Sequence, residues 1–514
     1  MIDASGNAAL YFVDRHANGA IRDKTAYVEA DGARRSLSYA QLAEQSGRVA
    51  DLLTRHGLDR ESRVAMLVLD QIEFPVIFWG ALKAGVVPIA LNTLLASDVY
   101  AAILEDSRAS ALFVSHGLTP VVAPLLANHP HLRKIFVIGG EPPAGALSFE
   151  RELAESKSRP AVAVSPDECA FWLYSSGSTG QPKGVRHVHG SLKYTADTYG
   201  AQVLEIAQSD IVFSAAKLFF AYGLGNAMTF PLSVGATSVL FAGRPTPDAV
   251  FDILDRFKPT IFCGVPTLYA AMAAQLEAGR AGVAAPLRRC ISAGEALPRE
   301  IGDRWRRLTG VDILDGVGST EMLHIYLSNR AGDVVYGASG VAVPGYEVRL
   351  VDENDRDVVE GEVGELLVRG DSAAADYWNR RDKSRSTFQG HWTRTGDKYE
   401  KLPGGRFAYC GRTDDMFKVS GIWVAPFEVE QALISYPAVL EAAVVPARDV
   451  DGLEKPKAFV VLKPGADGAD LGAALKDHVK DRIGKWKYPR WIEVIPELPK
   501  TATGKIQRFK LKEL

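Results

Sequence analysis

The fold of this chain is decided by a stretch that reads RVAMLVLDQIEFPVIFWGALKAGVVPIAL, residues 63–91. Apolar runs at 63–69 and 86–91 predict strands, and the segment between them, 72–85, predicts a helix. Strands this apolar are buried on both faces, so they predict a parallel sheet that is covered by helices.

The same alternation continues on both sides of this stretch. Before it, Ser38 and Gln41 have the spacing of a capping box at a helix start. After it, the pattern predicts helices at 97–106 and 119–128 and strands at 111–114 and 134–139. It resumes after residue 205 with KPTIFCGVP, LRRCISAGEALP and VDILDGVGSTE, each of which predicts a strand that runs into a glycine-containing turn. Ligands of such sheets bind at the carboxyl ends of the strands.

The texture changes near residue 335. Short β-branched segments and Gly/Pro/Asp turns over 335–411 predict a small antiparallel sheet or barrel. The remainder predicts helices at 426–436 and 470–483 and strands near 440–446, 457–463 and 491–495. We therefore expect an α/β protein with a large N-terminal domain, residues 1–413, that holds doubly wound parallel sheets and a small β-barrel. A smaller, mobile α+β C-terminal domain follows at 414–514.

Composition excludes several classes of protein. Fifty-nine Lys and Arg face 62 Asp and Glu in 514 residues, a formal net charge of -3, which argues against nucleic-acid binding. Four scattered cysteines without a CxxC pair indicate a reduced compartment. The N-terminus fits no signal peptide, so we expect a cytoplasmic protein. Residues 218–243 carry no charge, but their polar and glycine content predicts a buried helix, turn and strand and no membrane span.

The string YSSGSTGQPKG, residues 174–184, carries the clearest chemical signal. It joins an apolar strand to glycines, small hydroxyl side chains and a lysine. Glycines allow backbone N–H groups to converge on phosphate oxygens, hydroxyls add donors, and Lys183 adds positive charge. The string therefore predicts a loop that cradles an anion.

Further strings follow in an order that resembles the adenylate-forming superfamily of acyl- and aryl-CoA synthetases, luciferases and peptide-synthetase adenylation domains. The string at 174–184 resembles the phosphate loop of that family. The other matching strings are SAGEALP at 292–298, DGVGSTE at 315–321, GELLVRG at 364–370, WTRTGD at 392–397, GRTDDMFKVSG at 411–421 and PKTATGK at 499–505. The resemblance runs nearly from end to end.

This resemblance implies a reaction with two halves. A carboxylate attacks the α-phosphorus of ATP to give an acyl-adenylate and pyrophosphate, and the thiol of coenzyme A then displaces AMP. The implied catalytic residues are Lys505, Thr320 and Glu321, with Glu321 also as the Mg²⁺ ligand. The implied ATP-binding residues are Ser175, Ser176, Gly177, Ser178, Thr179, Gly180, Lys183, Ala293, Gly294, Glu295, Asp315, Gly316, Asp397 and Arg412.

The resemblance also implies that the C-terminal domain moves. Lys505 lies in that domain yet must reach ATP during adenylation, so the domain docks one way for each half-reaction. Asp414 matches the hinge position. Lys418 and Gly421 match the face that is presented for thioester formation, where Gly421 leaves room for the pantetheine arm.

The acid is expected to be aromatic. SAAKLFFAYGLGN at 214–226 and EMLHIYLSN at 321–329 resemble benzoate- and 4-hydroxybenzoate-CoA ligases, in which matching residues sandwich the ring; these are Ala221, Tyr222, Gly223, Gly318, His324 and Ile325. A flat slot between glycine backbones and a tyrosine face suits a planar ring. The role of His324 stays open, as a contact to the acid or as a core histidine. Lys217 receives no role.

Other interpretations remain. The acid could be an aminobenzoate or a fatty acid, or the acyl group could be loaded onto a carrier protein. A kinase or ATPase would release other products, and a non-catalytic nucleotide-binding protein would show no turnover. We treat His187 and His189 as structural, on a strand that points both rings to one side. The expected partners are an aromatic carboxylic acid, ATP and CoA, with no nucleic acid and no membrane, in a monomer or homodimer that serves aromatic degradation.

Overall fold

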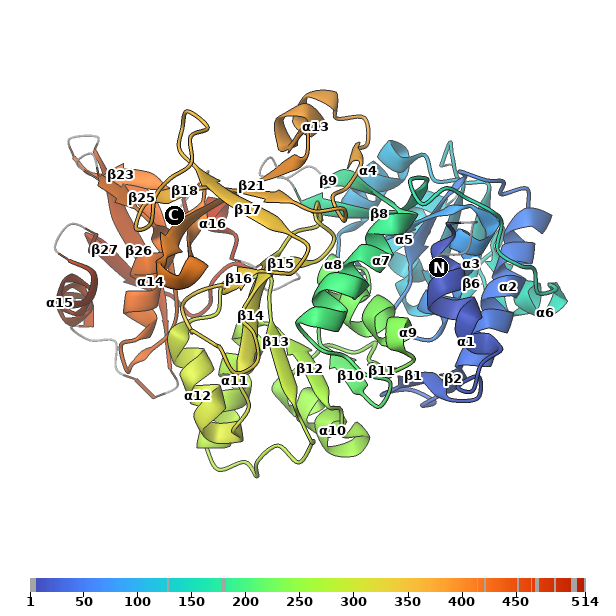
Figure 1. The fold of residues 1–514 in the computed structure, drawn as a ribbon, viewed down its shortest axis with the longest axis horizontal. Helices are drawn as coiled ribbons and strands as arrows, with labels where there is room; N and C mark the ends of the chain where they lie inside the picture. The colour runs from blue at the N-terminus through green and yellow to red at the C-terminus, as the bar shows by residue number, and fades with distance from the viewer. Residues whose placement is uncertain are drawn as a thin grey trace.

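The computed structural model of the chain describes residues 6–126, 129–176, 182–413, 415–419, 422–450, 453–463, 465–466, 471–484, 487–500 and 506–512. Large, mostly parallel sheets with helices around them form its body, and a smaller part follows after residue 414. Figure 1 shows the chain running from the blue N-terminal layers at the right to the red C-terminal part at the left. The expected α/β class is confirmed.

One sheet is built from the alternation that opens the chain. Its strand order is β19-β9-β8-β4-β3-β5-β6-β7. The bounds are β3 Arg63–Leu67, β4 Val87–Ala90, β5 Ala111–Ser115, β6 Lys134–Ile138, β7 Leu147–Ser148, β8 Cys169–Ser176, β9 Pro182–Val188 and β19 Asp376–Tyr377. The strands from β4 to β7 pair in parallel, whereas β9 and β19 add an antiparallel edge. The predicted strand–helix–strand unit at 63–91 is confirmed as β3, α3 (Glu73–Ala84) and β4.

A second sheet has the order β16-β15-β14-β13-β12-β10-β11-β1-β2. The bounds are β1 Thr25–Glu29, β2 Ser36–Ser38, β10 Ile211–Ser214, β11 Thr237–Leu240, β12 Ile261–Gly264, β13 Arg289–Ser292, β14 Ile313–Gly318, β15 Ile325–Ser328 and β16 Val341–Ala342. Its central strands β11, β10, β12, β13 and β14 run parallel. The three strings that predicted strands after residue 205 form β12, β13 and β14.

Helices cover these sheets. Their bounds are α1 Arg15–Ala17, α2 Tyr39–Arg55, α4 Ser97–Ser107, α5 Thr119–Leu126, α6 Phe149–Glu155, α7 His189–Thr195, α8 Ala221–Leu224, α9 Phe230–Val234, α10 Pro247–Phe257, α11 Pro266–Glu277, α12 Arg299–Thr309 and α13 Arg381–Thr387. The capping box predicted at Ser38 and Gln41 is present, because each side chain accepts a hydrogen bond from the other residue's backbone N–H.

The uncharged segment 218–243 folds as expected into buried helical turns and a strand. It forms α8, a π-helical turn at Gly225–Thr229, α9 and β11. Met228 and Leu232 are fully buried in the largest hydrophobic core. In the part of the chain that the structure describes, no helix has both the length and the apolar character that crossing a membrane needs.

The region predicted as a small barrel is an antiparallel sheet. Its strands are β17 Glu347–Val351, β18 Val363–Arg369, β20 Phe388–Gln389, β21 Trp392–Leu402 and β22 Arg406–Arg412. The C-terminal part holds β23 Phe417–Val419, β24 Ile422–Val424, β25 Val439–Arg448, β26 Glu454–Leu462 and β27 Trp491–Val494, with α14 Pro426–Ile434, α15 Leu471–Ile483 and α16 Arg508–Leu511. Its apolar side chains form two cores of their own, whose members lie between Phe417 and Leu511 in the sequence. The boundary predicted at Asp414 lies outside the described residues.

Candidate active site

Several of the predicted segments meet at one edge of the second sheet. Strands β10, β13 and β14 run parallel in that sheet. Their carboxyl ends lead into residues 215–223, 293–298 and 319–324, which hold the strings that predicted the acid slot, the adenine motif and the Thr-Glu motif. Because the carboxyl ends of parallel strands share one edge, these segments lie together.

Glu321 is fixed in a turn between the two large sheets. The hydroxyl of Tyr377, at the edge of the first sheet, donates a hydrogen bond to Glu321 Oε1 at 2.7 Å. Lys183 Nζ lies 3.5 Å from the same oxygen. The backbone N–H of Ala374 donates to the Glu321 carbonyl at 2.8 Å. The turn that follows β14 is therefore tied to β9 and β19 of the other sheet.

Neighbouring charges keep the Glu321 carboxylate ionised. Burial alone would raise its pKa, but Lys183 and the Tyr377 hydroxyl outweigh burial and hold the pKa below its ordinary value. Lys183 also lies 4.2 Å from the centre of the Tyr377 ring, in cation–π contact. The Glu321 side chain is 17% exposed. An ionised carboxylate that is mostly buried but keeps some exposure fits a Mg²⁺ ion that takes its other ligands from water and phosphate.

His187 supports the same turn from behind. Its Nε2 lies 2.8 Å from the carbonyl oxygen of Thr320, and its ring stacks on Phe171. Burial lowers the pKa of His187 to about 4, so the ring is neutral at pH 7. His189, expected on the same strand, instead begins α7 and accepts a hydrogen bond from the Ala8 backbone. The expectation that His189 lies on the strand with His187 is therefore wrong.

The phosphate-loop string is only partly described. Ser175 lies on β8 opposite Lys183 on β9. The Ser175 hydroxyl is buried, and it has no hydrogen-bond partner among the described residues. Ser176 ends β8. The predicted site residues Gly177, Ser178, Thr179 and Gly180 lie outside the described residues.

The predicted adenine residues follow β13 or lie within β14. Ala293 is buried, and Gly294 has a φ of +95°, a left-handed conformation that favours glycine. Asp315 is 4% exposed, and burial raises the pKa of its carboxyl well above the ordinary value, although backbone N–H groups of Leu297 and Gly316 oppose that rise. The structure thus places the buried Asp315 carboxyl where the resemblance expects the adenine base to bind.

The predicted ribose residues form an ion pair. Arg412 Nη1 lies 2.9 Å from Asp397 Oδ1, and the two residues are opposite each other on β21 and β22. The nearby Asp397 carboxylate raises the pKa of Arg412. The small antiparallel sheet therefore presents one carboxylate, held in place by a guanidinium, close to the second sheet.

The predicted acid slot is lined by a tyrosine whose hydroxyl is anchored in the second sheet. Tyr222 Oη donates to the carbonyl oxygens of Gly264 and Ile291, at 3.2 and 3.1 Å. Tyr222 lies on α8 with Ala221 and Gly223, all three among the residues that the sequence assigned to the slot. The anchored ring presents a rigid aromatic face.

Glycine is required on the opposite wall. A Cβ at Gly318 would lie 2.5 Å from the carbonyl oxygen of His324, and a Cβ at Gly316 would lie 2.9 Å from Ile325 Cγ2. Strand β14 can therefore approach β15 closely only without side chains at these positions. The register of the two strands also shifts between Val317 and Gly318. Gly318, His324 and Ile325, all predicted slot residues, are in this way brought together.

His324 is enclosed by aromatic rings. Its ring centre lies 5.0 Å from that of Tyr199, 5.9 Å from Tyr222 and 4.6 Å from Phe230. Burial lowers its pKa to about 3, so the ring carries no charge at pH 7. Nδ1 is buried, and no residue of the described part of the chain bonds to it. The slot thus meets a neutral, polar ring.

The C-terminal part contacts the adenine segment. The backbone N–H of Ile506, the residue after Lys505, donates to Glu295 Oε1 at 3.2 Å. Arg482 lies 3.5 Å from Glu300, and the Gln431 side chain accepts from the Arg299 backbone. Lys505, Asp414 and Gly421 themselves are outside the described residues, as is the side chain of Lys418 on β23.

The segment around Ile506 is anchored by a buried ion pair. Arg508 makes two hydrogen bonds of 2.9 Å to the Glu430 carboxylate. Glu430 is 3% exposed and also accepts from the Val444 backbone at 2.8 Å. This pair fixes the last helix, α16, to the interior of the C-terminal part.

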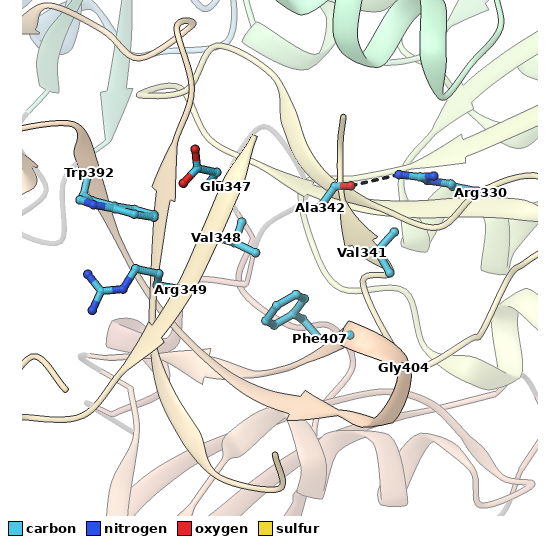
Figure 2. A pocket seen from close by; sticks show the side chains of 10 residues that line it. Arg330, Val341, Ala342, Glu347, Val348, Arg349, Trp392, Gly404 and Phe407 are labelled. Carbon is cyan, nitrogen blue, oxygen red and sulfur yellow. Dashed lines mark hydrogen bonds between the residues drawn. The ribbon is translucent and has the colours of Figure 1, made fainter. Parts of the chain in front are cut away.

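A wide surface groove lies apart from this site. It has a volume of about 570 Å³ and opens between β16 and β17, where Figure 2 shows Val341, Val348 and Phe407 around it. Arg330 bonds to the Ala342 carbonyl along its wall. None of the residues that the motifs nominate lines this groove.

Two residues at the site were missed by the sequence analysis. Tyr377 touches both Glu321 and Lys183, and Asp70 binds the backbone of the segment that leads to the slot. Tyr377 stands in the string DYWN, and Asp70 follows the predicted strand at 63–69. Only the position of Asp70 after a predicted parallel strand could have indicated a site residue.

Comparison with known proteins gives two family matches. Residues 13–378 match the model of the AMP-binding enzyme family, and residues 428–505 match the AMP-binding enzyme C-terminal domain. The chain is 52% identical over 512 residues to a 4-hydroxybenzoate–CoA/benzoate–CoA ligase of Rhodopseudomonas palustris, covering 99% of this chain and 94% of that one. It is 53% identical over 510 residues to a benzoate–CoA ligase of Thauera aromatica, covering 98% and 95%.

Solved structures give the same picture. A benzoate CoA ligase from Burkholderia xenovorans superposes with a TM-score of 0.91 at 48% identity, covering 98% of this chain and 99% of that one. The anthranilate CoA ligase AuaEII, in complex with anthranoyl-AMP, superposes with a TM-score of 0.95 at 41% identity, covering 100% and 98%. The likeness therefore extends over the whole described fold.

The neutral, buried His187 predicts acid lability. Its pKa in the folded protein is about 4, below the ordinary 6.5. The unfolded chain therefore takes up this proton first, and the free energy of unfolding falls as pH drops from 6.5 toward 4. Between about pH 7.5 and about pH 5, this one ring should lower the free energy of unfolding by about 2 kcal/mol. His187→Gln, which keeps a donor for Thr320, should show a shallower fall in urea unfolding at the two pH values. An unchanged slope would contradict this account of His187.

Tyr377 is predicted to raise the metal affinity of Glu321. Tyr377→Phe keeps the ring below Lys183 but removes the hydrogen bond that orients the carboxylate. Removing such an orienting partner typically weakens metal binding by about tenfold or more. We expect that loss in the affinity for Mn²⁺ with ATP, measured by electron paramagnetic resonance. Tyr100→Phe, which removes a buried hydroxyl from the Asn92 carbonyl instead, is the matched control. Equal affinities in both variants would contradict the prediction.

Proposed function

Because the chain belongs to the AMP-binding enzyme family, we propose that it is an ATP-dependent CoA ligase for an aromatic carboxylic acid. The acid is of the benzoate or 4-hydroxybenzoate type. In the first half-reaction its carboxylate oxygen bonds to the α-phosphorus of ATP, and pyrophosphate leaves. In the second, the sulfur of coenzyme A bonds to the acyl carbon, the thiol proton is lost, and AMP leaves.

The observation that supports this proposal is that Tyr222, Gly318 and His324, three of the predicted slot residues, lie together beside the turn that holds Glu321. The slot is enclosed by the anchored Tyr222 ring and the close approach of β14 and β15 at Gly318. Both walls are flat, which suits a ring and leaves little depth for an alkyl chain. The relatives that share about half of their residues with this chain are named for benzoate and 4-hydroxybenzoate. Their names support the same class of acid.

The first half-reaction brings two negatively charged groups together. A carboxylate that approaches a triphosphate is repelled by like charge, so phosphate oxygens must be neutralised and the reacting atoms held in line. We assign Lys183 and the Ser175 hydroxyl to phosphate oxygens and Thr320 to the α-phosphate. Glu321 would hold Mg²⁺, which when bound supplies charge neutralisation at the phosphates. Burial lowers the pKa of Lys183, while Glu321 raises it.

The nucleotide is assigned to the remaining segments. We assign the adenine to the segment of Ala293, Gly294 and Glu295 and to the strand of Asp315 and Gly316. The ribose hydroxyls are assigned to the Asp397 carboxylate, which Arg412 orients. A carboxylate that accepts two hydroxyl donors is the chemistry expected there.

Lys505 is assigned to the first half-reaction. The contact of its neighbour Ile506 with Glu295, beside the proposed adenine segment, supports this assignment. Asp414 as hinge and Lys418 and Gly421 at the thioester-forming face remain proposals from the motif match. So do a cytoplasmic location, a role in aromatic degradation, a monomer or homodimer, and the absence of nucleic-acid and membrane partners.

Pyrophosphate and AMP formation test the proposal directly. Purified protein with MgATP and CoA is assayed with benzoate, 4-hydroxybenzoate, 2-aminobenzoate, cyclohexanecarboxylate and a medium-chain fatty acid. We expect benzoate or 4-hydroxybenzoate to give the highest kcat/KM, with one AMP and one pyrophosphate per thioester. ADP or inorganic phosphate as the product, or a preference for the fatty acid, would refute it. Thioester formation only on a carrier protein would support the alternative acceptor.

Lys505→Ala should separate the two half-reactions. Without the lysine that reaches ATP and the carboxylate, acid-dependent pyrophosphate release should fall by about 10²-fold or more, the usual cost of losing one charge that stabilises the transition state. Thioester formation from supplied benzoyl-AMP should remain. Lys500→Ala, which removes another lysine of the same segment that pairs with Glu441, is the control. Equal loss of both half-reactions in Lys505→Ala would contradict the assignment.

A further inference from the structure

Lys217 is a partly buried lysine that the proposed chemistry leaves without a role. It lies three residues after the end of β10, in the segment that leads to the acid slot. Its ammonium donates hydrogen bonds to two backbone carbonyls after β11, those of Phe241 and of Gly243, the latter at 2.7 Å. Burial lowers the pKa of Lys217, and the carboxylates of Asp70 and Asp31 oppose that change.

The loop that Lys217 binds is also held from its N–H side. Asp31 accepts hydrogen bonds from the backbone N–H of Gly243 at 3.0 Å and of Ala242 at 3.5 Å. A lysine on the carbonyls and an aspartate on the N–H groups fix the loop at 241–243 from two directions. This loop is thus a firm support for the Lys217 side chain.

Asp70 fixes the next residue from the other sheet. It follows β3 of the first sheet and is 4% exposed. Both of its carboxylate oxygens lie 3.2 Å from the backbone N–H of Leu218. Residues 217 and 218 are therefore held at once by the loop after β11 in the second sheet and by the first sheet.

The wall of the acid slot rests on this fixed point. The backbone N–H of Phe220 donates to the Lys217 carbonyl at 3.0 Å. A Cβ at Gly223 would lie only 2.1 Å from that same carbonyl oxygen and 2.6 Å from the oxygen of Ala216. Helix α8 is thus seated directly on the backbone of Lys217. A shift of Lys217 would move α8, and with it Tyr222.

We propose that Lys217 and Asp70 are positioning residues that set the width of the acid slot by fixing the backbone beneath α8. The proposal rests on the proposed function and adds to it two residues that touch neither ATP nor the acid. Binding of the acid should depend on them, whereas binding of ATP should not.

The cost of burying Asp70 agrees with such a role. Burial raises its pKa to about 6, against the opposing effects of Lys217 and the Leu218 N–H, and Asp31 raises it further. The folded protein therefore holds this proton more tightly than the unfolded chain, so the free energy of unfolding falls as pH rises from about 4 to about 6. At neutral pH the ionised carboxylate lowers stability. A neutral amide would fill the same space at less cost.

The experiment compares four variants of the full-length protein. Lys217→Met keeps the apolar stem and removes the ammonium, and Asp70→Asn keeps the shape and removes the charge. Lys83→Met is the matched control, because Lys83 is also an enclosed lysine and pairs with Asp14 and the Ala43 carbonyl, away from the site. KM for benzoate, KM for ATP and the melting temperature are measured for each.

We expect KM for benzoate to rise about tenfold in Lys217→Met, the effect of losing one charge-assisted hydrogen bond. It should also rise in Asp70→Asn, but by less, because the amide oxygen still accepts from the Leu218 N–H without the charge. KM for ATP should change by less than about twofold in both, and Lys83→Met should change neither KM. Asp70→Asn should melt at an equal or higher temperature than the wild type. Lys217→Arg, which retains the donors, should restore most of the affinity for benzoate.

Two results would overturn the proposal. Equal increases in both KM values would mean that the two residues serve only general stability, and unchanged KM values would mean that they do not position the slot. Should Lys217→Met fail to fold, Asp70→Asn decides alone. A wild-type protein without acid-dependent pyrophosphate release would instead refute the proposed function.

Discussion

The structure depends on a buried carboxylate that must stay charged between two sheets. Glu321 follows a strand of one sheet, and its oxygen is held by Tyr377 and Lys183 from the other. An ionised group at this depth is tolerated only where cations and donors compensate for lost hydration. The two sheets are thereby fixed to each other at the place where a triphosphate would be handled. The remaining site residues are arranged around this junction.

The proposed acid slot depends on two closely packed walls. Glycines at 316 and 318 let two strands approach so closely that a side chain would collide with the backbone. The opposite wall is Tyr222, whose hydroxyl donates hydrogen bonds to two backbone carbonyls. Neither wall can adjust much, because a packed interior resists changes of even one methylene. If the acid binds here as proposed, selectivity for a flat ring would come from the backbone more than from individual polar contacts.

Much of the fold could be predicted because its signals are local. The apolar runs at 63–91 and the Ser38 capping box specify their own strands and helix start, and the structure has them there. The motif strings likewise predicted which segments meet, since parallel strands present their carboxyl ends at one edge.

The contacts that fix the site could not be predicted in this way, since they join residues far apart in sequence. Tyr377 lies 56 positions from Glu321, and Asp70 lies 148 from Leu218. No periodicity reports such pairs. The paired imidazoles at 187 and 189 were misplaced because β9 ends one residue earlier than the pattern predicted.

The contacts between the C-terminal part and the adenine segment have an energetic consequence. They include a hydrogen bond from the Ile506 backbone to Glu295 and one from the Arg299 backbone to the Gln431 side chain. They also include an ion pair between Arg482 and Glu300, in which the Arg482 side chain is 52% exposed and the Glu300 side chain 31%. Exposed pairs of this kind contribute about 0–1 kcal/mol each. These three contacts therefore add little to the free energy that holds the two parts together, to which the edge contact of Phe427 with Tyr409, with ring centres 5.4 Å apart, also contributes. A nucleotide that bound beside Glu295, as proposed, would add contacts to this weak set and so favour the apposed arrangement without any large input of strain.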